Sequence, residues 1–310
     1  MSSDNSALKW PDDFDPPVGK PVQIEPGLRR LLADNPSPMT YRGTNTYLLG
    51  DTDLAVIDPG PDVPGHLDAI LAAVGPGQRI SHIVVTHSHR DHSLLARPLA
   101  EATGAPVLAF GDATAGRSAM MSDLAASGLG GGGEGLHADF VPDITLAEGD
   151  MVQGPGWTLE VIHTPGHLGN HISLAFGDAC LSGDHVMGWA SSIVSPPDGD
   201  IGDFMASCRK LLTRDWRVFY PGHGAPVTTP AARIEWLMDH RLKREAAILG
   251  ALSFAAATPQ VLAARIYTET PRKMLGMATR NVFAHLVDLT RRNLAAPDGP
   301  LSEKAVFRRI

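Results

Sequence analysis

Short apolar runs and amphipathic segments alternate along the first part of the chain. In "TYLLGDTDLAVIDPG" apolar β-formers flank turn residues at Gly50 to Asp53, which predicts two short strands. "HLDAILAAV", ending at Gly75, and "LLARPLAEATG", stopped by Gly104, have helical spacing, whereas "RISHIVVTH" and "APVLAF" are typical of buried strands. The order strand, helix, strand, helix, strand predicts an α/β layered architecture.

The middle of the chain continues with strands. Apolar runs bounded by polar clusters predict four more of them, "WTLEVIHT", "HISLAF", "ACLSGD" and "WRVFYPG". Between the two groups of strands, the glycine-rich stretch Gly128–Gly135 can hold no regular structure. We expect a loop there, and a surface insertion is favoured over a lid for the site.

From "PAARIEWLMDHRLKREAAILGAL" onward the pattern becomes helical, so we place a domain boundary near Pro226 to Pro230 and expect domains at 1–228 and 229–310. Thr258 is a candidate N-cap followed by Pro259 at the first helical position. "NLAAPDGPLSEKAVFRRI" predicts two strands around a Pro-Asp-Gly turn. Helices followed by a hairpin are the order of a winged helix. The helix before the hairpin is expected to bury an apolar stripe and to turn three arginines to solvent: Arg280, Arg291 and Arg292.

Composition narrows the class of protein. The chain has 310 residues, 43% of them hydrophobic, and no apolar run of membrane-spanning length. Its first residues, "MSSDNSALKWPDDFDPPVGK", resemble neither a secretory signal nor a transit peptide, and two cysteines are too few for a disulfide framework. We therefore expect a cytoplasmic protein without a membrane partner.

Charge is distributed unevenly along the chain. Residues 1–228 hold 13 Lys and Arg against 27 Asp and Glu, a net −14, whereas residues 229–310 hold 13 against 7, a net +6. The basic region could contact a nucleic-acid backbone, or its helices could simply present a solvated basic face. The sequence leaves both interpretations open, as it does homodimer formation through this module.

The segment "VVTHSHRDHS" concentrates chemistry directly behind an apolar run. It holds His87 and His89 at the end of a predicted strand and Asp91 and His92 on the loop expected to follow, all within six positions. A core cannot bury four such groups cheaply unless something pairs with them. Imidazole and carboxylate ligands together suit a borderline divalent ion such as Zn²⁺.

Three further candidate ligands lie just past predicted strands. They are His167 in "TPGH", Asp184 in "SGDH" and His223 in "PGHG", each preceded by glycine, which permits a tight turn. Seven ligand-type side chains at strand ends can converge on one sheet edge. That set is sufficient for two metal ions, with a carboxylate between them.

"HSHRDH" followed by "TPGH", "SGDH" and "PGHG" resembles the metallo-β-lactamase-fold hydrolases. The resemblance implies an αββα sandwich and two Zn²⁺ per chain. It assigns His87, His89 and His167 to the first zinc and Asp91, His92 and His223 to the second, with Asp184 bridging them.

The similarity extends from Gly43 to the C-terminus through "GTNTYLLG", "HRLKREAAIL" and the winged-helix-like module. These segments resemble the lactamase-beta-like protein 2 group, which includes a mitochondrial endoribonuclease.

This ligand set predicts hydrolysis by a metal-bridging hydroxide, with Asp91 and Asp184 as the catalytic carboxylates. Asp58 either accepts a hydrogen bond from a ligand imidazole or is only a turn aspartate before Pro59, and His171 is a candidate substrate contact. We expect the substrate to be a phosphodiester, with single-stranded RNA as a candidate. Two alternatives stay open: hydrolysis of a small-molecule thioester as by glyoxalase II, and non-catalytic nucleic-acid binding with structural metals.

Overall fold

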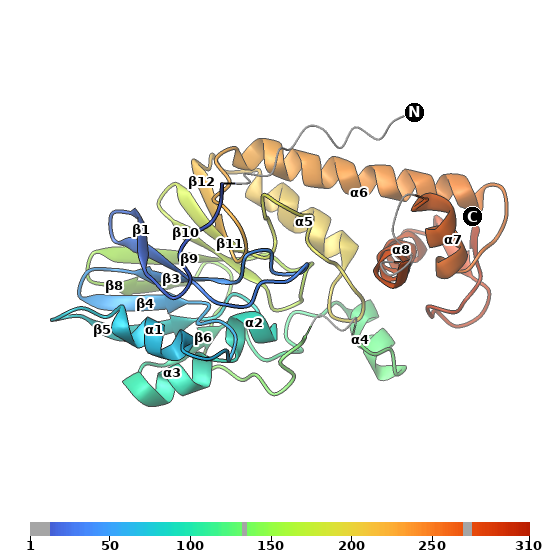
Figure 1. Cartoon of the computed structure of the whole chain (residues 1–310). Helices are drawn as coiled ribbons and strands as arrows, with labels where there is room; N and C mark the ends of the chain where they lie inside the picture. The colour runs from blue at the N-terminus through green and yellow to red at the C-terminus, as the bar shows by residue number, and fades with distance from the viewer. Residues whose placement is uncertain (1–12, 132–134, 269–274) are drawn as a thin grey trace.

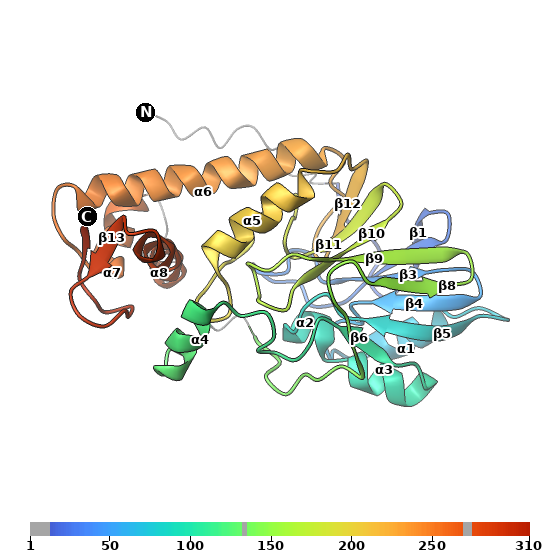
Figure 2. The same ribbon diagram turned by 180° about the vertical axis from the view of Figure 1, so that it is seen from behind.

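Two β-sheets packed face to face form the centre of the chain, and helices cover their outer faces (Figures 1 and 2). The structure, a computed structural model, describes residues 13–131, 135–268 and 275–310. This arrangement confirms the predicted αββα sandwich. Among the described residues no helix is both long and apolar enough to cross a membrane.

The first sheet carries the motif "HSHRDH" just past the carboxyl end of one of its interior strands. Its strands β1 to β4 pair antiparallel and β4 to β7 pair parallel. In spatial order they are β1 (Val22–Glu25), β2 (Leu28–Leu32), β3 (Asn45–Leu49), β4 (Asp53–Ile57), β5 (Arg79–Val84), β6 (Val107–Ala109) and β7 (Ile144–Thr145). Two helices cover the outer face: α1 (His66–Ala72) and α3 (Ala96–Thr103).

The second sheet supplies the remaining candidate ligands. In spatial order its strands are β12 (Val218–Pro221), β11 (Ala179–Gly183), β10 (Ile172–Phe176), β9 (Trp157–His163) and β8 (Met151–Gly154). Its outer face packs against α5 (Ile201–Leu211) and the first half of α6 (Pro230–Leu252).

Alternation along the strands explains the layers. In β4, Ala55 and Ile57 point into the core between the sheets, whereas Leu54 and Val56 pack toward α1 and α3. Because successive side chains of a strand point to opposite faces, a central strand buried on both sides reads as a continuous apolar run. Cys180 and Cys208 are buried, unpaired thiols.

The long helix α6 runs from the second sheet to a separate C-terminal cluster (Figure 1). There it packs with α7 (Pro259–Ile266), α8 (Leu275–Arg291) and the hairpin of β13 (Ala295–Pro297) and β14 (Phe307–Arg309). The short helix α4 (Ala119–Ala126), which belongs to the first part of the chain, contributes Met121 and Leu124 to the same cluster.

Helix signals in the sequence are confirmed where capping is local. Thr258 caps α7 through its hydroxyl, which accepts from the Val261 amide, and Pro259 occupies the first turn. Gly104 ends α3 in the left-handed conformation.

Two local predictions need correction. The hairpin strands are joined by residues 298–306 and not by a tight Pro-Asp-Gly turn, because Leu301 of this connection packs against the C-terminal cluster. Asp91 and His92 lie on a single helical turn, α2 (Arg90–Ser93), and not on an irregular loop, since the His89 carbonyl accepts from the amides of His92 and Ser93. The predicted Gly128–Gly135 loop lies partly outside the described residues.

Candidate metal centre

The seven candidate ligands follow the ends of four strands, and the two sheets bring these ends together. The segment after β5 carries His87 and His89, and α2 follows directly with Asp91 and His92. The second sheet adds one ligand after each of three strands: His167 after β9, Asp184 after β11 and His223 after β12.

The first group of donors contains three imidazoles. His89 Nδ1 lies 3.1 Å from His87 Nε2 and 3.0 Å from His167 Nε2. All three residues are buried, and their donor atoms form one of the groups able to hold a metal ion.

The second group combines two imidazoles with a carboxylate. His223 Nε2 lies 3.3 Å from His92 Nε2 and 3.2 Å from Asp91 Oδ2. Asp91 is the most exposed of the seven ligands, with 24% of its side chain accessible. It therefore faces the side from which water and substrate can approach.

Asp184 lies between the two groups. Its Oδ2 is 3.3 Å from His223 Nε2 and 3.8 Å from His167 Nε2, and its Oδ1 is 3.6 Å from His92 Nε2. Oδ1 is buried without a hydrogen-bond donor among the described residues, which is costly for a carboxylate oxygen unless a cation binds there. Ligands of a tetrahedral zinc ion lie roughly 3.3–3.6 Å apart. The donor types and spacing thus fit divalent metal ions in both groups.

Gly222 explains why a glycine precedes His223. A Cβ at this position would lie 2.4 Å from Asp184 Oδ1 and 2.6 Å from His92 Cε1. Only a residue without a side chain lets the β12 end approach these two ligands.

Hydrogen bonds from surrounding groups fix the orientation of the ligand imidazoles. His92 Nδ1 donates to Asp58 Oδ2 at 2.9 Å, and the same carboxylate accepts from the Thr86 amide and hydroxyl at 2.7 and 2.8 Å. His167 Nδ1 donates to the Ile193 carbonyl at 2.6 Å. Such partners select the tautomer that leaves the other ring nitrogen free for a metal. Of the two interpretations of Asp58, the geometry favours the hydrogen-bonding role.

His171, the candidate substrate contact, lies inside the protein. This side chain is fully buried, its Nε2 accepts from the Asp184 amide at 3.1 Å, and its Nδ1 therefore donates to the Thr164 hydroxyl at 2.9 Å. Burial, together with the nearby His185 and His167 rings, holds the pKa of His171 well below its usual value. His171 is thus a neutral imidazole that supports the backbone of Asp184.

The histidines of the two donor groups differ in the direction in which their pKa values are shifted. Burial lowers the pKa of His89 to about 3 and the pKa of His87 well below its usual value, so both are neutral at physiological pH. Burial acts in the same direction on His223, but the Asp184 and Asp91 carboxylates outweigh it and raise its pKa to about 9. The carboxylates thus require positive charge beside them, which a divalent cation would supply in place of protons.

Sequence reasoning missed Asn45 as a site residue. Its side-chain amide donates to the carbonyls of Pro221 and Gly224 at 3.0 and 2.9 Å, on either side of His223. The signal was the asparagine in "GTNTYLLG", a polar residue at the start of an otherwise apolar strand.

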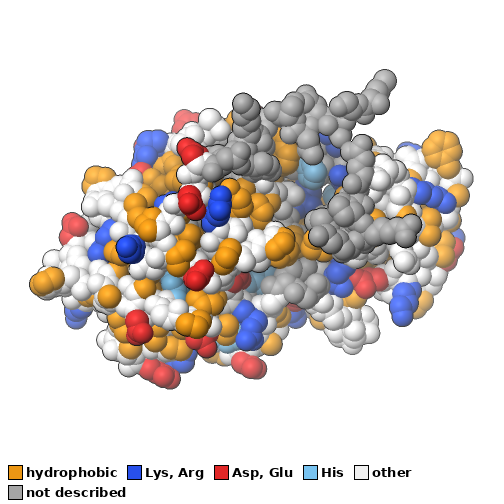
Figure 3. All heavy atoms as spheres, in the orientation of Figure 1, with side chains coloured by type: hydrophobic (Ala, Val, Ile, Leu, Met, Phe, Trp, Pro, Cys, Tyr) orange, Lys and Arg blue, Asp and Glu red, His pale blue; other side chains and the backbone are white. Residues whose placement is uncertain are grey.

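The three C-terminal arginines combine solvent exposure with contacts inside the chain. Arg291 and Arg292 keep 34% and 40% of their side chains accessible, in line with the prediction, whereas Arg280 keeps 20%. Arg280 donates to the Ser195 hydroxyl and pairs with Glu303, both at 2.7 Å. Arg291 pairs with Asp200 and Asp288, and Arg292 pairs with Glu245 and Asp288. On the face shown in Figure 3, basic and acidic side chains of this region are interspersed. All three arginines are thus engaged in contacts within the chain.

Comparisons with known proteins agree with this architecture. Residues 39–223 match the metallo-beta-lactamase superfamily, and residues 258–300 match the beta-lactamase associated winged helix domain. The chain is 32% identical over 280 residues to the beta-lactamase-like protein 2 homolog of Drosophila melanogaster, covering 84% of this chain and 87% of that protein. It is 30% identical over 244 residues to an atrochrysone carboxyl ACP thioesterase of Paecilomyces divaricatus, covering 76% and 68%.

A solved structure shows the same fold over nearly the whole length. A beta-lactamase domain protein from Burkholderia ambifaria superposes with a TM-score of 0.79 at 22% identity, covering 98% of this chain and 97% of that one. The resemblance expected from the sequence motifs, including the C-terminal winged helix, is confirmed.

Proposed function

The chain belongs to the metallo-beta-lactamase superfamily and is a hydrolase, and we propose that it is a dinuclear zinc enzyme that hydrolyses acyl thioesters. The observation that carries the proposal is the pair of donor groups joined by Asp184. Structural zinc sites are typically closed by four protein ligands that include cysteines, whereas three His or Asp ligands without cysteine are typical of catalytic zinc.

The chain's own residues define the reaction site. His87, His89 and His167 would hold one ion, and Asp91, His92 and His223 the other, with Asp184 between them. When bound, the ions would lower the pKa of water and polarise the scissile carbonyl. Asp91, the exposed carboxylate, would ligate the second ion through Oδ2, which lies 3.2 Å from His223 Nε2, and its other oxygen could accept a hydrogen bond that orients the attacking water. Buried Asp184 and the neutral imidazoles of His87 and His89 would keep the ligand set in place while negative charge develops on the carbonyl oxygen of the substrate.

Two observations support a thioester over RNA. Arg280, Arg291 and Arg292, three arginines of the basic region that could contact a nucleic-acid backbone, form ion pairs within the chain. Several relatives that match three quarters or more of the chain carry the name atrochrysone carboxyl ACP thioesterase. A thioester needs no extended basic surface, because its reacting carbonyl is neutral.

A phosphodiester, single-stranded RNA included, is the second candidate. The adjacency of two ligand groups favours it, since paired metal ions stabilise both the attacking and the leaving oxygen in phosphoryl transfer. The substrate classes therefore have to be compared directly.

The test is a turnover screen with zinc-loaded protein. Its substrates are S-lactoylglutathione, an acyl-pantetheine thioester, bis(p-nitrophenyl) phosphate and single-stranded RNA, each with Asp91→Ala as control. We expect thioester turnover that the Asp91 variant loses. Turnover of the phosphodiesters alone would replace the thioester proposal with the second candidate, and thioester turnover unaffected by Asp91→Ala would refute the assigned site.

A further inference from the structure

Residues 192–200, here called the clamped loop, lie between the candidate metal ligands and the C-terminal region. On the ligand side, the Ile193 carbonyl accepts from His167 Nδ1 at 2.6 Å. The Ser192 hydroxyl donates to the carbonyls of Asp184 and His185. The clamped loop thus contacts one ligand of the first group and the residue that lies between the groups.

Arginines from α6 and α8 hold the other side of the clamped loop. Arg241 donates to the Ser192 carbonyl, next to the carbonyl that orients His167. Arg280 donates to the Ser195 hydroxyl at 2.7 Å and also to the Pro196 carbonyl. The residues that hold the loop therefore come from the C-terminal region, 229–310, which the sequence predicts to be a separate domain.

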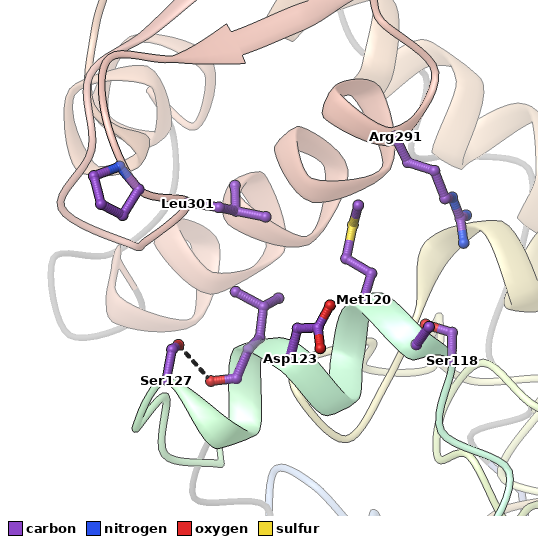
Figure 4. A pocket seen from close by; sticks show the side chains of 9 residues that line it. Ser118, Met120, Asp123, Ser127, Arg291 and Leu301 are labelled. Atoms are coloured by element: carbon purple, nitrogen blue, oxygen red, sulfur yellow. Dashed lines mark hydrogen bonds between the residues drawn. The ribbon is translucent and has the colours of Figure 1, made fainter.

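The end of the clamped loop is fixed in the same way. Asp200 pairs with Arg291 of α8 at 3.1 Å, accepts from the Ser118 hydroxyl at 2.9 Å and donates its amide to the Gly166 carbonyl at 2.9 Å. Figure 4 shows Arg291, at the end of α8, and Ser118, the N-cap of α4, among the side chains that line a pocket between these two helices. Gly166 directly precedes the ligand His167, so this contact also leads to the first group.

Arg241 is costly if its only role is stability. It is 2% exposed, and among the described residues it has no carboxylate within ion-pair distance. Its contacts are the Ser192 carbonyl and the face of the Phe204 ring, 5.2 Å from the guanidinium carbon. Burying a charged side chain without an ion-pair partner costs free energy, and an apolar side chain in its place is often neutral or stabilising. The presence of Arg241 at this position therefore points to a role other than stability.

We propose that Arg241 and Arg280 are positioning residues, through which the C-terminal region sets the orientation of His167 and Asp184. The inference rests on the proposed metal centre. On this proposal the C-terminal region helps to assemble the metal centre. That role differs from binding nucleic acid and from packing alone. Partners that orient metal ligands contribute about 10–100-fold to metal affinity or activity.

The test compares Arg280→Ala with Arg280→Lys and with Arg292→Ala. Arg292 lies just beyond α8 and has two ion pairs, but neither of its partners belongs to the clamped loop. Zinc affinity is measured by competition with a chromophoric chelator, and melting temperature is measured in parallel. We expect Arg280→Ala to lose about 10-fold or more in zinc affinity. Arg280→Lys should recover part of that loss, and Arg292→Ala should stay near wild type even if its melting temperature falls as far.

Hydrogen exchange on the metal-free proteins provides an independent measurement. The proposal predicts faster exchange at the amides of residues 193–200 and 166–169 in Arg280→Ala than in Arg292→Ala. Equal exchange or equal zinc affinity in these two variants would overturn it. A wild-type protein that binds no zinc would refute the metal centre instead, and the exchange comparison would still decide whether the arginines hold the loop. For Arg241, Arg241→Met fills the buried site without the donor and is expected to give the same exchange signature.

Discussion

Replacing Asp58 by asparagine should weaken zinc binding while leaving the stability of the metal-free protein nearly unchanged. In the native site the buried Asp58 carboxylate accepts from His92 Nδ1 at 2.9 Å and from the Thr86 amide at 2.7 Å. The new side chain of the Asp58→Asn variant keeps one acceptor for the Thr86 amide, but its NH₂ group faces His92 Nδ1. Two donors cannot share that contact, so His92 must move its proton to Nε2, the nitrogen that points at Asp91 and His223.

The hydrogen bonds that each variant keeps determine the expected changes in zinc affinity and stability. Loss of a group that orients a metal ligand costs about 10–100-fold in affinity, which is about 1.4–2.7 kcal/mol. Stability of the metal-free protein should change less in Asp58→Asn than in Asp58→Ala, because the alanine leaves the buried Thr86 amide without a partner, at about 1–3 kcal/mol.

Chelator competition for zinc and urea unfolding of the metal-free variants measure the two effects separately. We expect Asp58→Asn to fold with near-native stability and bind zinc weakly, and Asp58→Ala to lose both. Wild-type zinc affinity in Asp58→Asn would refute the assignment of the His92 tautomer and, with it, the role of Asp58.

Three further predictions concern stability and close packing. Burial and, to a lesser extent, the charge of Asp200 raise the pKa of Asp203 to about 6. Between about pH 4 and pH 6 the folded protein therefore holds a proton that the unfolded chain has released. The free energy of unfolding accordingly falls as the pH rises through this range. Asp203→Asn should therefore raise the melting temperature at pH 7.5 but not near pH 4, and an equal gain at both pH values would contradict this reasoning. Gly222→Ala should fold but bind zinc weakly, because the new methyl group overlaps Asp184 Oδ1; zinc titration decides, and unchanged affinity would mean that the ligands can move apart. Arg291→Glu should cost about 3 kcal/mol in urea unfolding, since it sets a like charge beside buried Asp200; unchanged stability with loss of RNA binding would restore the nucleic-acid interpretation.

Local chemistry was readable from the sequence where residue type and chain direction determine it. The strands before His87, His167, Asp184 and His223 follow from apolar runs, and the ligands follow from histidines and aspartates placed at their ends. Thr258 and Gly104 marked helix ends because caps act within one turn. The two sheets then determine which ends meet, and the family resemblance implied that arrangement.

Contacts between distant segments could not be predicted in the same way. Arg280 and Arg291 lie on the polar side of α8, and the pattern of such a face is the same whether it meets water or another part of the chain. His171 lies four residues after His167, yet its ring is fully buried and accepts a hydrogen bond from the Asp184 amide. The spacing in the sequence predicts that His171 lies near the metal ligands, but it does not predict which way the His171 side chain points.

Metal content tests the central claim most directly. Protein purified without chelators and analysed by mass spectrometry for metals should contain close to two equivalents per chain, mostly zinc. His167→Ala and His223→Ala should each lower that number toward one, because they belong to different donor groups. Folded wild-type protein that reproducibly contains no metal, and takes up none from zinc buffer, would contradict the account.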